Sequence, residues 1–205
     1  MKEITMSTNP LYAAAKKAIN KVVDNFQNYP TRFWNERDIH WSLFYYLEQA
    51  NIIRENYTTQ LIRAEFPTLK GFGGARGHYD LVIINYESFN RPEVQSMNQQ
   101  ISWKDFLSSI ELDAAIEIKL WLSRLLKPGA MEERVDWDIQ KLTDEAKNVK
   151  NAYFLNFVQL DFKHEYNEAY YQRLRDYLVT QKKPGLNILC VPSDRQLRSN
   201  TDNWL

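Results

Sequence analysis

The amino-acid sequence predicts an α/β protein in which helices flank a central mixed sheet, folded as a single domain over residues 1–205. Apolar residues recur at helical spacing in several segments, and runs of β-branched and aromatic residues of strand length lie between them. The two kinds of segment alternate along the second half of the chain, which is typical of a sheet covered by helices.

Two helices are expected before the first strand. Apolar residues recur at helical spacing over residues 11–26, and Pro30 with Thr31 marks the break that follows. The second helix is expected to begin near Asn35 and to run to residue 50.

Three strands should follow, because their residues are mostly β-branched, aliphatic or aromatic. These strands are expected at residues 58–66, 78–86 and 114–122. Residues 67–77, which join the first two, are glycine-rich but lack the Gly-Lys-Ser/Thr ending of a phosphate-binding loop, so a flexible hairpin connection is expected. A short helix over residues 103–110 is expected before the third strand.

The remaining elements are a helix, a strand, a helix and a strand. From Val135 the helix has an apolar stripe at positions 135, 139, 142, 146 and 149. The later elements are a strand at 152–160, a helix at 168–181 and a strand at 186–191, with Pro184 and Gly185 in the last turn. The expected order is therefore α, α, β, β, β, α, β, α, β.

Composition narrows the functional classes. Lys plus Arg and Asp plus Glu both total 26, so the chain has no global positive field of the kind typical of non-specific nucleic-acid binding. The single cysteine, Cys190, lies in an apolar run and excludes an internal disulfide. Neither a signal peptide nor a membrane span is apparent, so we expect a cytoplasmic protein with no membrane partner.

An acid and a base lie in the middle of the apolar strand expected at 114–122. Because side chains alternate between the faces of a strand, Glu117 and Lys119 share one face with Trp121. Burying an ionised group without a partner costs several kcal/mol, so such groups are paired, neutral or bound to a cation.

A second carboxylate occupies a similar position in the strand expected at 78–86. Asp80 is expected to share a face with His78 and Val82. Two carboxylates beside a lysine suit a hard divalent cation, since Mg²⁺ takes oxygen ligands from one or two carboxylates, water and phosphate. This combination favours phosphodiester hydrolysis.

These residues resemble the signature of a known superfamily. Asp80 on one strand and the triplet Glu117, Ile118 and Lys119 on the next resemble the motif of the PD-(D/E)XK nucleases, which have the restriction-endonuclease-like fold. The resemblance implies an αβββαβ core over about residues 31–160, with the N-terminal helix and the C-terminal helix and strand as additions.

The chain departs from the family pattern in two ways. Tyr79 stands where the family name has a proline, and the long spacing from Asp80 to Glu117 implies an insertion between the second and third strands. The resemblance implies Mg²⁺ or Mn²⁺ as cofactor, with Asp80, Glu117 and Ile118 as metal ligands.

Further site residues follow from the resemblance. A helix acid often completes the family's site, and Glu36 is in register with the inward stripe of the second helix; a purely local role in the first helical turn is the alternative. On the helix after the triplet, Gln140 and Lys141 are the positions that would support the site, and Asp138 is less favoured. The expected catalytic residues are Asp80, Glu117, Lys119, Glu36 and Gln140.

Residues that would contact nucleic acid are a separate group. Lys70 and Arg76 lie in the glycine-rich connection, where they could contact a phosphate backbone, or the connection could be only a hairpin link. His78 and Lys141 complete this group. Five of the tryptophans are expected in the core and not as stacking platforms for bases: Trp34, Trp41, Trp103, Trp121 and Trp137.

The favoured function is a metal-dependent nuclease that acts on DNA, in restriction, repair or defence against foreign DNA. The alternative is a catalytically inactive nucleic-acid-binding or scaffolding member of the same fold. An RNA substrate, a homodimer and a partner protein in a larger system are all compatible with the sequence.

Overall fold

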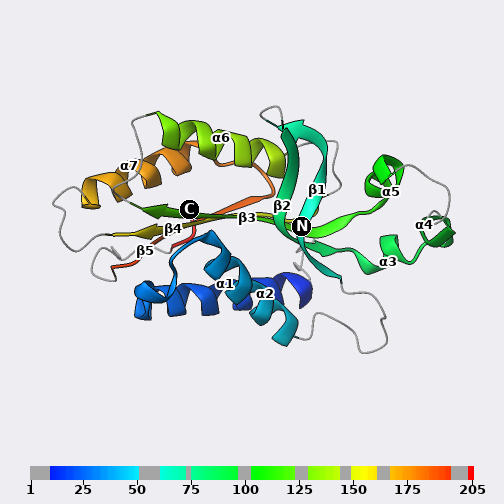
Figure 1. Cartoon of the computed structure of the whole chain (residues 1–205), viewed down its shortest axis with the longest axis horizontal. Helices are drawn as coiled ribbons and strands as arrows, with labels where there is room; N and C mark the ends of the chain where they lie inside the picture. Colours follow the sequence, from blue (N-terminus) through cyan, green and yellow to red (C-terminus); the bar gives the residue numbers. More distant parts are fainter. Residues whose placement is uncertain are drawn as a thin grey trace, which may run out of the picture.

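The computed structural model has helices on both faces of a mixed five-stranded sheet, so the coarse α/β class is confirmed (Figure 1). It describes residues 10–50, 61–72, 75–96, 103–122, 129–143, 149–160, 167–194 and 203–205. Within these residues, no helix is long and apolar enough to cross a membrane.

The main elements occur in the predicted order, with short helices added. The helices are α1 (Pro10–Asn28), η1 (Pro30–Arg32), α2 (Glu36–Gln49), α3 (Tyr86–Phe89), α4 (Pro92–Ser96), α5 (Trp103–Ser109), α6 (Ala130–Leu142) and α7 (Asn167–Thr180). The strands are β1 (Ile62–Phe72), β2 (Ala75–Ile84), β3 (Leu112–Leu122), β4 (Ala152–Gln159) and β5 (Leu186–Pro192).

The strands lie in the sheet in chain order, β1-β2-β3-β4-β5. The first three are antiparallel neighbours, whereas β3, β4 and β5 run parallel to one another. Parallel neighbours need crossover connections, and α6 and α7 provide them on one face of the sheet. In Figure 1, α1 and α2 cover the opposite face.

Alternating side chains of the sheet form two separate hydrophobic cores. Val82 and Phe154 pack in the core that includes residues of α6 and α7, whereas Leu81 and Leu155 pack with α1 and α2. The central strands are therefore buried on both faces, which explains their nearly continuous apolar sequences.

The structure corrects the expected boundaries at two places. Strand β1 extends to Phe72 and β2 begins at Ala75, so the positions of Lys70 and Arg76 lie in strands and not in a flexible connection. Helix α6 ends at Leu142, and Val149, expected on its stripe, forms a parallel bridge with Leu112 instead. Residue 146 lies outside the described residues.

Candidate functional site

The candidate site lies where β2 and β3 stop pairing. Their described pairing runs from Ile84 to Leu81 on β2, where Leu81 is opposite Ile116. Strand β3 continues to Leu122 with β4 on its other side. The last part of β3 therefore has backbone N–H groups that β2 does not take up.

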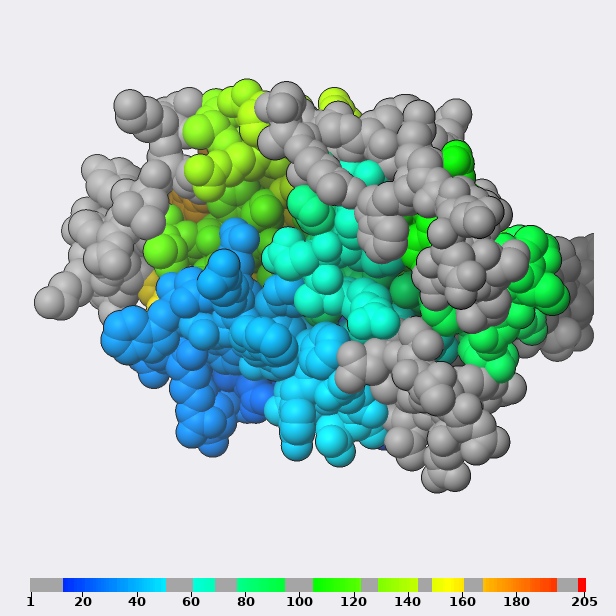
Figure 2. Space-filling view, turned by 45° about the vertical axis from the view of Figure 1, so that its right-hand side comes forward, coloured from blue at the N-terminus to red at the C-terminus, as the bar shows by residue number. Residues whose placement is uncertain are grey.

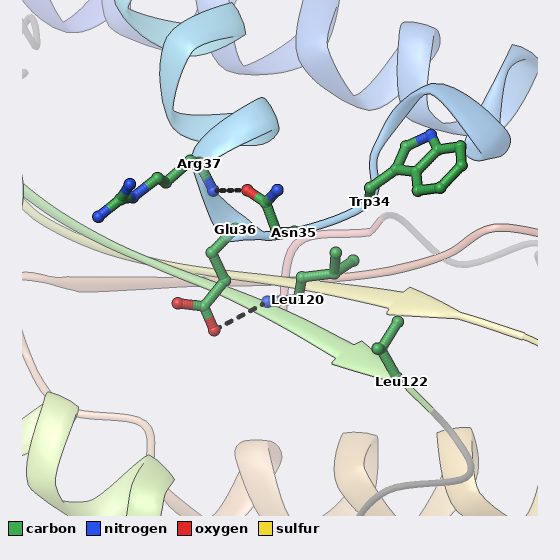
Figure 3. A pocket seen from close by; sticks show the side chains of 6 residues that line it. All are labelled: Trp34, Asn35, Glu36, Arg37, Leu120 and Leu122. Carbon is green, nitrogen blue, oxygen red and sulfur yellow. Dashed lines mark hydrogen bonds between the residues drawn. The ribbon is translucent and has the colours of Figure 1, made fainter.

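Two carboxylates accept hydrogen bonds from this edge of β3. Asp80 Oδ2 accepts from the Ile118 N–H at 2.6 Å, and Glu36 Oε1 accepts from the Leu120 N–H at 3.4 Å (Figure 3). Backbone N–H groups of a strand are nearly always hydrogen-bonded, so these side chains take the place of the missing strand partner. The acids are held by the same backbone edge that carries Glu117 and Lys119.

The pairing of β1 with β2 is irregular opposite Asp80. The residue of β1 at this point is Glu65, which has a φ of 51°, in the left-handed region that non-glycine residues rarely adopt. The described ladder pairs flank it at Ala64 and Phe66. Contrary to the expected alternation, Tyr79 packs in the same core as Val82. Backbone strain of this kind clusters at functional sites.

Glu36 is placed by the start of α2. Asn35 caps this helix, with its side chain accepting from the Arg37 N–H and Asp38 accepting in return from the cap backbone. Glu36 is the first helical residue, and its side chain remains 46% exposed. It therefore lies at the rim of the site, while Ile39 and the later apolar residues of the stripe are buried.

Glu117 is the most deeply buried acid of the site, with no exposed surface. Lys141 Nζ donates to its Oε2 at 2.6 Å, whereas Oε1 has no hydrogen-bond partner within the described part of the chain. Burial, and then the nearby Asp80 carboxylate, raise the pKa of Glu117 well above its usual range despite Lys141. A buried carboxylate oxygen without a hydrogen-bond partner favours the binding of a cation beside it.

Asp138 links the two lysines. Its Oδ2 lies 3.1 Å from Lys119 Nζ, and its Oδ1 lies 2.8 Å from Lys141 Nζ. Burial alone would lower the pKa of Lys119, but the surrounding carboxylates, Asp138 foremost, raise it above the usual value. Burial alone would also lower the pKa of Lys141, but the carboxylates of Glu117 and Asp138 raise it above the usual value. Both lysines are therefore cationic at neutral pH.

The cluster contains more acids than bases. Four carboxylates (Glu36, Asp80, Glu117 and Asp138) surround the ammonium groups of Lys119 and Lys141. Burial is the largest influence on the pKa of Asp80, which it raises. Two acids remain uncompensated when all are ionised, so one divalent cation would neutralise the cluster.

The oxygen donors suit a hard cation of this kind. Asp80 and Glu117 supply carboxylates, and Ile118 has its backbone carbonyl, since the N–H and C=O of one strand residue point to the same edge. Among the described residues, no group of three or more His, Cys, Asp or Glu side chains is arranged to hold a metal. A Mg²⁺ site with two carboxylates and one carbonyl needs no third such side chain.

The structure brings most of the predicted site residues together. Asp80, Glu117, Lys119 and Glu36 converge, and Lys141 lies inside the cluster, where it also donates to the His78 backbone carbonyl at 3.3 Å. His78 therefore contributes its backbone to the cluster, and its side chain is half-buried. The side chains of Lys70 and Arg76 lie outside the described residues.

The expectation for α6 needs correction. Gln140 is exposed, whereas Asp138, ranked below it, is buried at the centre of the ion pairs. Residues three apart share a helix face, so the position of Asp138 relative to Val135 was a signal in the sequence. The apolar stripe at Val135 and Ile139 placed Gln140 on the outer side.

An open pocket of about 550 Å³ adjoins the cluster at Glu36 (Figure 3). It is lined by Trp34, Asn35, Glu36, Arg37, Leu120 and Leu122. Sequence reasoning missed this pocket because it joins the start of α2 to the end of β3, which are far apart in the chain.

Comparison with known proteins gave no relative of this chain. Known protein families, curated proteins and solved structures were searched, and none matched.

Proposed function

We propose that the protein is a metal-dependent nuclease that hydrolyses phosphodiester bonds of DNA. The observation that carries this proposal is the convergence of Asp80, Glu117 and Lys119 where two neighbouring strands separate. This is the arrangement expected from the resemblance to PD-(D/E)XK nucleases.

Asp80, Glu117 and the Ile118 carbonyl would hold Mg²⁺ or Mn²⁺. The unpartnered Oε1 of Glu117 and the excess of acids in the cluster support this assignment. When bound, such a cation polarises the phosphoryl group and lowers the pKa of water.

Lys119 has the properties of an electrostatic catalyst. Its raised pKa keeps it protonated, so it would orient the attacking water or stabilise negative charge on the phosphoryl oxygens, and it would not act as a base. Asp138, at 3.1 Å, positions this ammonium group. Burial raises the pKa of Glu36, which lies at the open rim of the cluster and could hold water there.

An inactive nucleic-acid-binding protein with this fold is the second candidate. The observation that favours it is the 2.6 Å contact between Lys141 and Glu117, because this ammonium group neutralises one of the metal-binding acids. In that case Asp138 and the two lysines would form a closed structural network.

A nuclease assay separates the two candidates. Wild-type protein and Asp80→Asn should be incubated with duplex, single-stranded and branched DNA, and with RNA, in Mg²⁺, in Mn²⁺ and in chelator. We expect metal-dependent DNA cleavage that Asp80→Asn abolishes and that Asp24→Asn, an exposed change on α1, preserves. Binding without cleavage of any substrate would support the inactive protein.

A further inference from the structure

Three large aromatic side chains are exposed on α2 and the residues before it. The exposed fractions are 80% for Trp34, 66% for Trp41 and 56% for Tyr45. The expectation of a core position is therefore wrong for Trp34 and Trp41, and also for Trp137, which is 46% exposed. Exposed aromatic surface of this extent next to a candidate site indicates a binding surface.

Two of these side chains follow one face of the helix. Arg37, Trp41 and Tyr45 are spaced by four residues on α2, so they form a stripe, which we call the aromatic stripe, whereas Trp34 precedes the N-cap of the helix. The opposite face of α2 buries Ile39, Leu43 and Leu47. Because the core holds that face, the aromatic stripe is directed outward, where α2 forms part of the molecular surface beside β1 and β2 (Figure 2).

A basic side chain begins the aromatic stripe. Arg37 is exposed, and in Figure 3 its guanidinium extends away from Trp34. No ion pair joins its guanidinium to a carboxylate within the described residues, so it is available to an anion. Aromatic faces beside a free guanidinium match the chemistry of a strand of bases and phosphates.

The pocket beside Glu36 has one aromatic wall and one apolar wall. Leu120 and Leu122 point from the end of β3 toward the start of α2, and Trp34 lies across from them. The Asn35 side-chain oxygen accepts from the Arg37 N–H, and its amide nitrogen lies on the side of Trp34. The pocket thus offers a flat ring, aliphatic contacts and a hydrogen-bond donor.

We propose that the aromatic stripe and this pocket bind an unpaired stretch of nucleic acid, with the base nearest the reacting phosphate stacked on Trp34. The inference rests on the proposed nuclease function and names its substrate as single-stranded or locally unpaired nucleic acid. Bases in a duplex already stack on one another, so only an unpaired base can present its face to Trp34. Because every base has such a face, the contact is tolerant of sequence.

Continuity with the acidic cluster favours nucleic acid over a second protein chain. Glu36 belongs both to the pocket and to the cluster, where its carboxylate lies 4.0 Å from Lys119 Nζ. A strand whose base occupies the pocket would therefore have an adjacent phosphate close to Asp80 and Lys119. A protein partner bound to the aromatic stripe would not need to reach Asp80 and Lys119.

Binding measured without cleavage tests the inference. A fluorescent oligothymidylate and a duplex should be titrated in chelator, at low salt, with wild-type protein, Trp34→Ala, Trp34→Phe and Trp137→Ala. Trp34→Ala should weaken single-strand binding about tenfold or more, the scale of losing one stacked base. Trp34→Phe should restore most of it, and duplex binding should be insensitive to Trp34.

Trp137→Ala is the matched control, because Trp137 is 46% exposed on α6 and outside the aromatic stripe. Equal single-strand affinity of Trp34→Ala and Trp137→Ala would overturn the inference, as would absence of single-strand binding by wild type. A wild-type dimer that Trp41→Ala dissociates in sedimentation would also overturn it, since the stripe would then join two copies. Trp34-dependent binding without any metal-dependent cleavage would instead refute only the nuclease proposal.

Discussion

Replacing Asp138 with asparagine should destabilise the protein strongly, although the change in shape is minimal. Asp138 contacts Lys119 at 3.1 Å and Lys141 at 2.8 Å, and all three side chains are largely buried. The side-chain oxygen of asparagine can accept a hydrogen bond from one lysine, but its NH₂ group then faces the other lysine. Removing one partner of a buried ion pair costs about 3–5 kcal/mol. For a domain of this size, that loss lowers the melting temperature by about 6–20 °C.

Urea unfolding of Asp138→Asn and wild type at neutral pH measures this loss. The Asp24→Asn variant serves as control, because Asp24 is exposed on α1 and its replacement should change the unfolding free energy by less than about 0.5 kcal/mol. Raised pKa values keep both lysines charged, so the deficit of Asp138→Asn should persist between about pH 6 and pH 9. A loss below about 1 kcal/mol, the scale of a surface pair, would refute the buried network.

Three further outcomes are expected. Lys119→Ala should lower single-turnover cleavage about a hundredfold or more while metal affinity survives, and a wild-type rate would reduce Lys119 to a structural counter-ion. The pKa of Glu117 is raised in the folded state, so wild-type stability should fall as pH rises above the ordinary pKa of a glutamate, and Glu117→Gln, which cannot ionise, should not show this fall. The same dependence of the unfolding free energy on pH in both proteins would contradict this expectation. Burial raises the pKa of Cys190 to about 12, so a thiol reagent should modify it only on unfolding, and rapid labelling of the native protein would contradict its placement.

The strand pattern was readable from the sequence because each central strand is buried on both faces. Apolar runs with an acid at one fixed position identified Asp80 and Glu117, and period-two alternation placed Lys119 beside Glu117. The helical stripe of α2 put Glu36 on the inward face, and the resemblance to the nuclease superfamily implied that a helix acid completes the site. The assignment of faces needed only the geometry within one element.

Features that depend on contacts between elements were not readable in the same way. The separation of β2 from β3, which leaves the Ile118 N–H to Asp80, depends on contacts between strands that are far apart in the chain. Exposure of Trp34 is equally a property of the assembled surface, since tryptophan is usually well buried. The lengths of β1 and β2 were misjudged because glycine marks both loops and irregular strands.

Counting bound Mn²⁺ by electron paramagnetic resonance tests most directly whether Asp80 and Glu117 form a metal site. Wild-type protein should bind Mn²⁺ at this site in competition with Mg²⁺. Asp80→Asn and Glu117→Gln should each lose that binding, while Asp24→Asn retains it. Equal Mn²⁺ binding by wild type and Asp80→Asn, or none by wild type at millimolar Mn²⁺, would contradict the proposed nuclease centre.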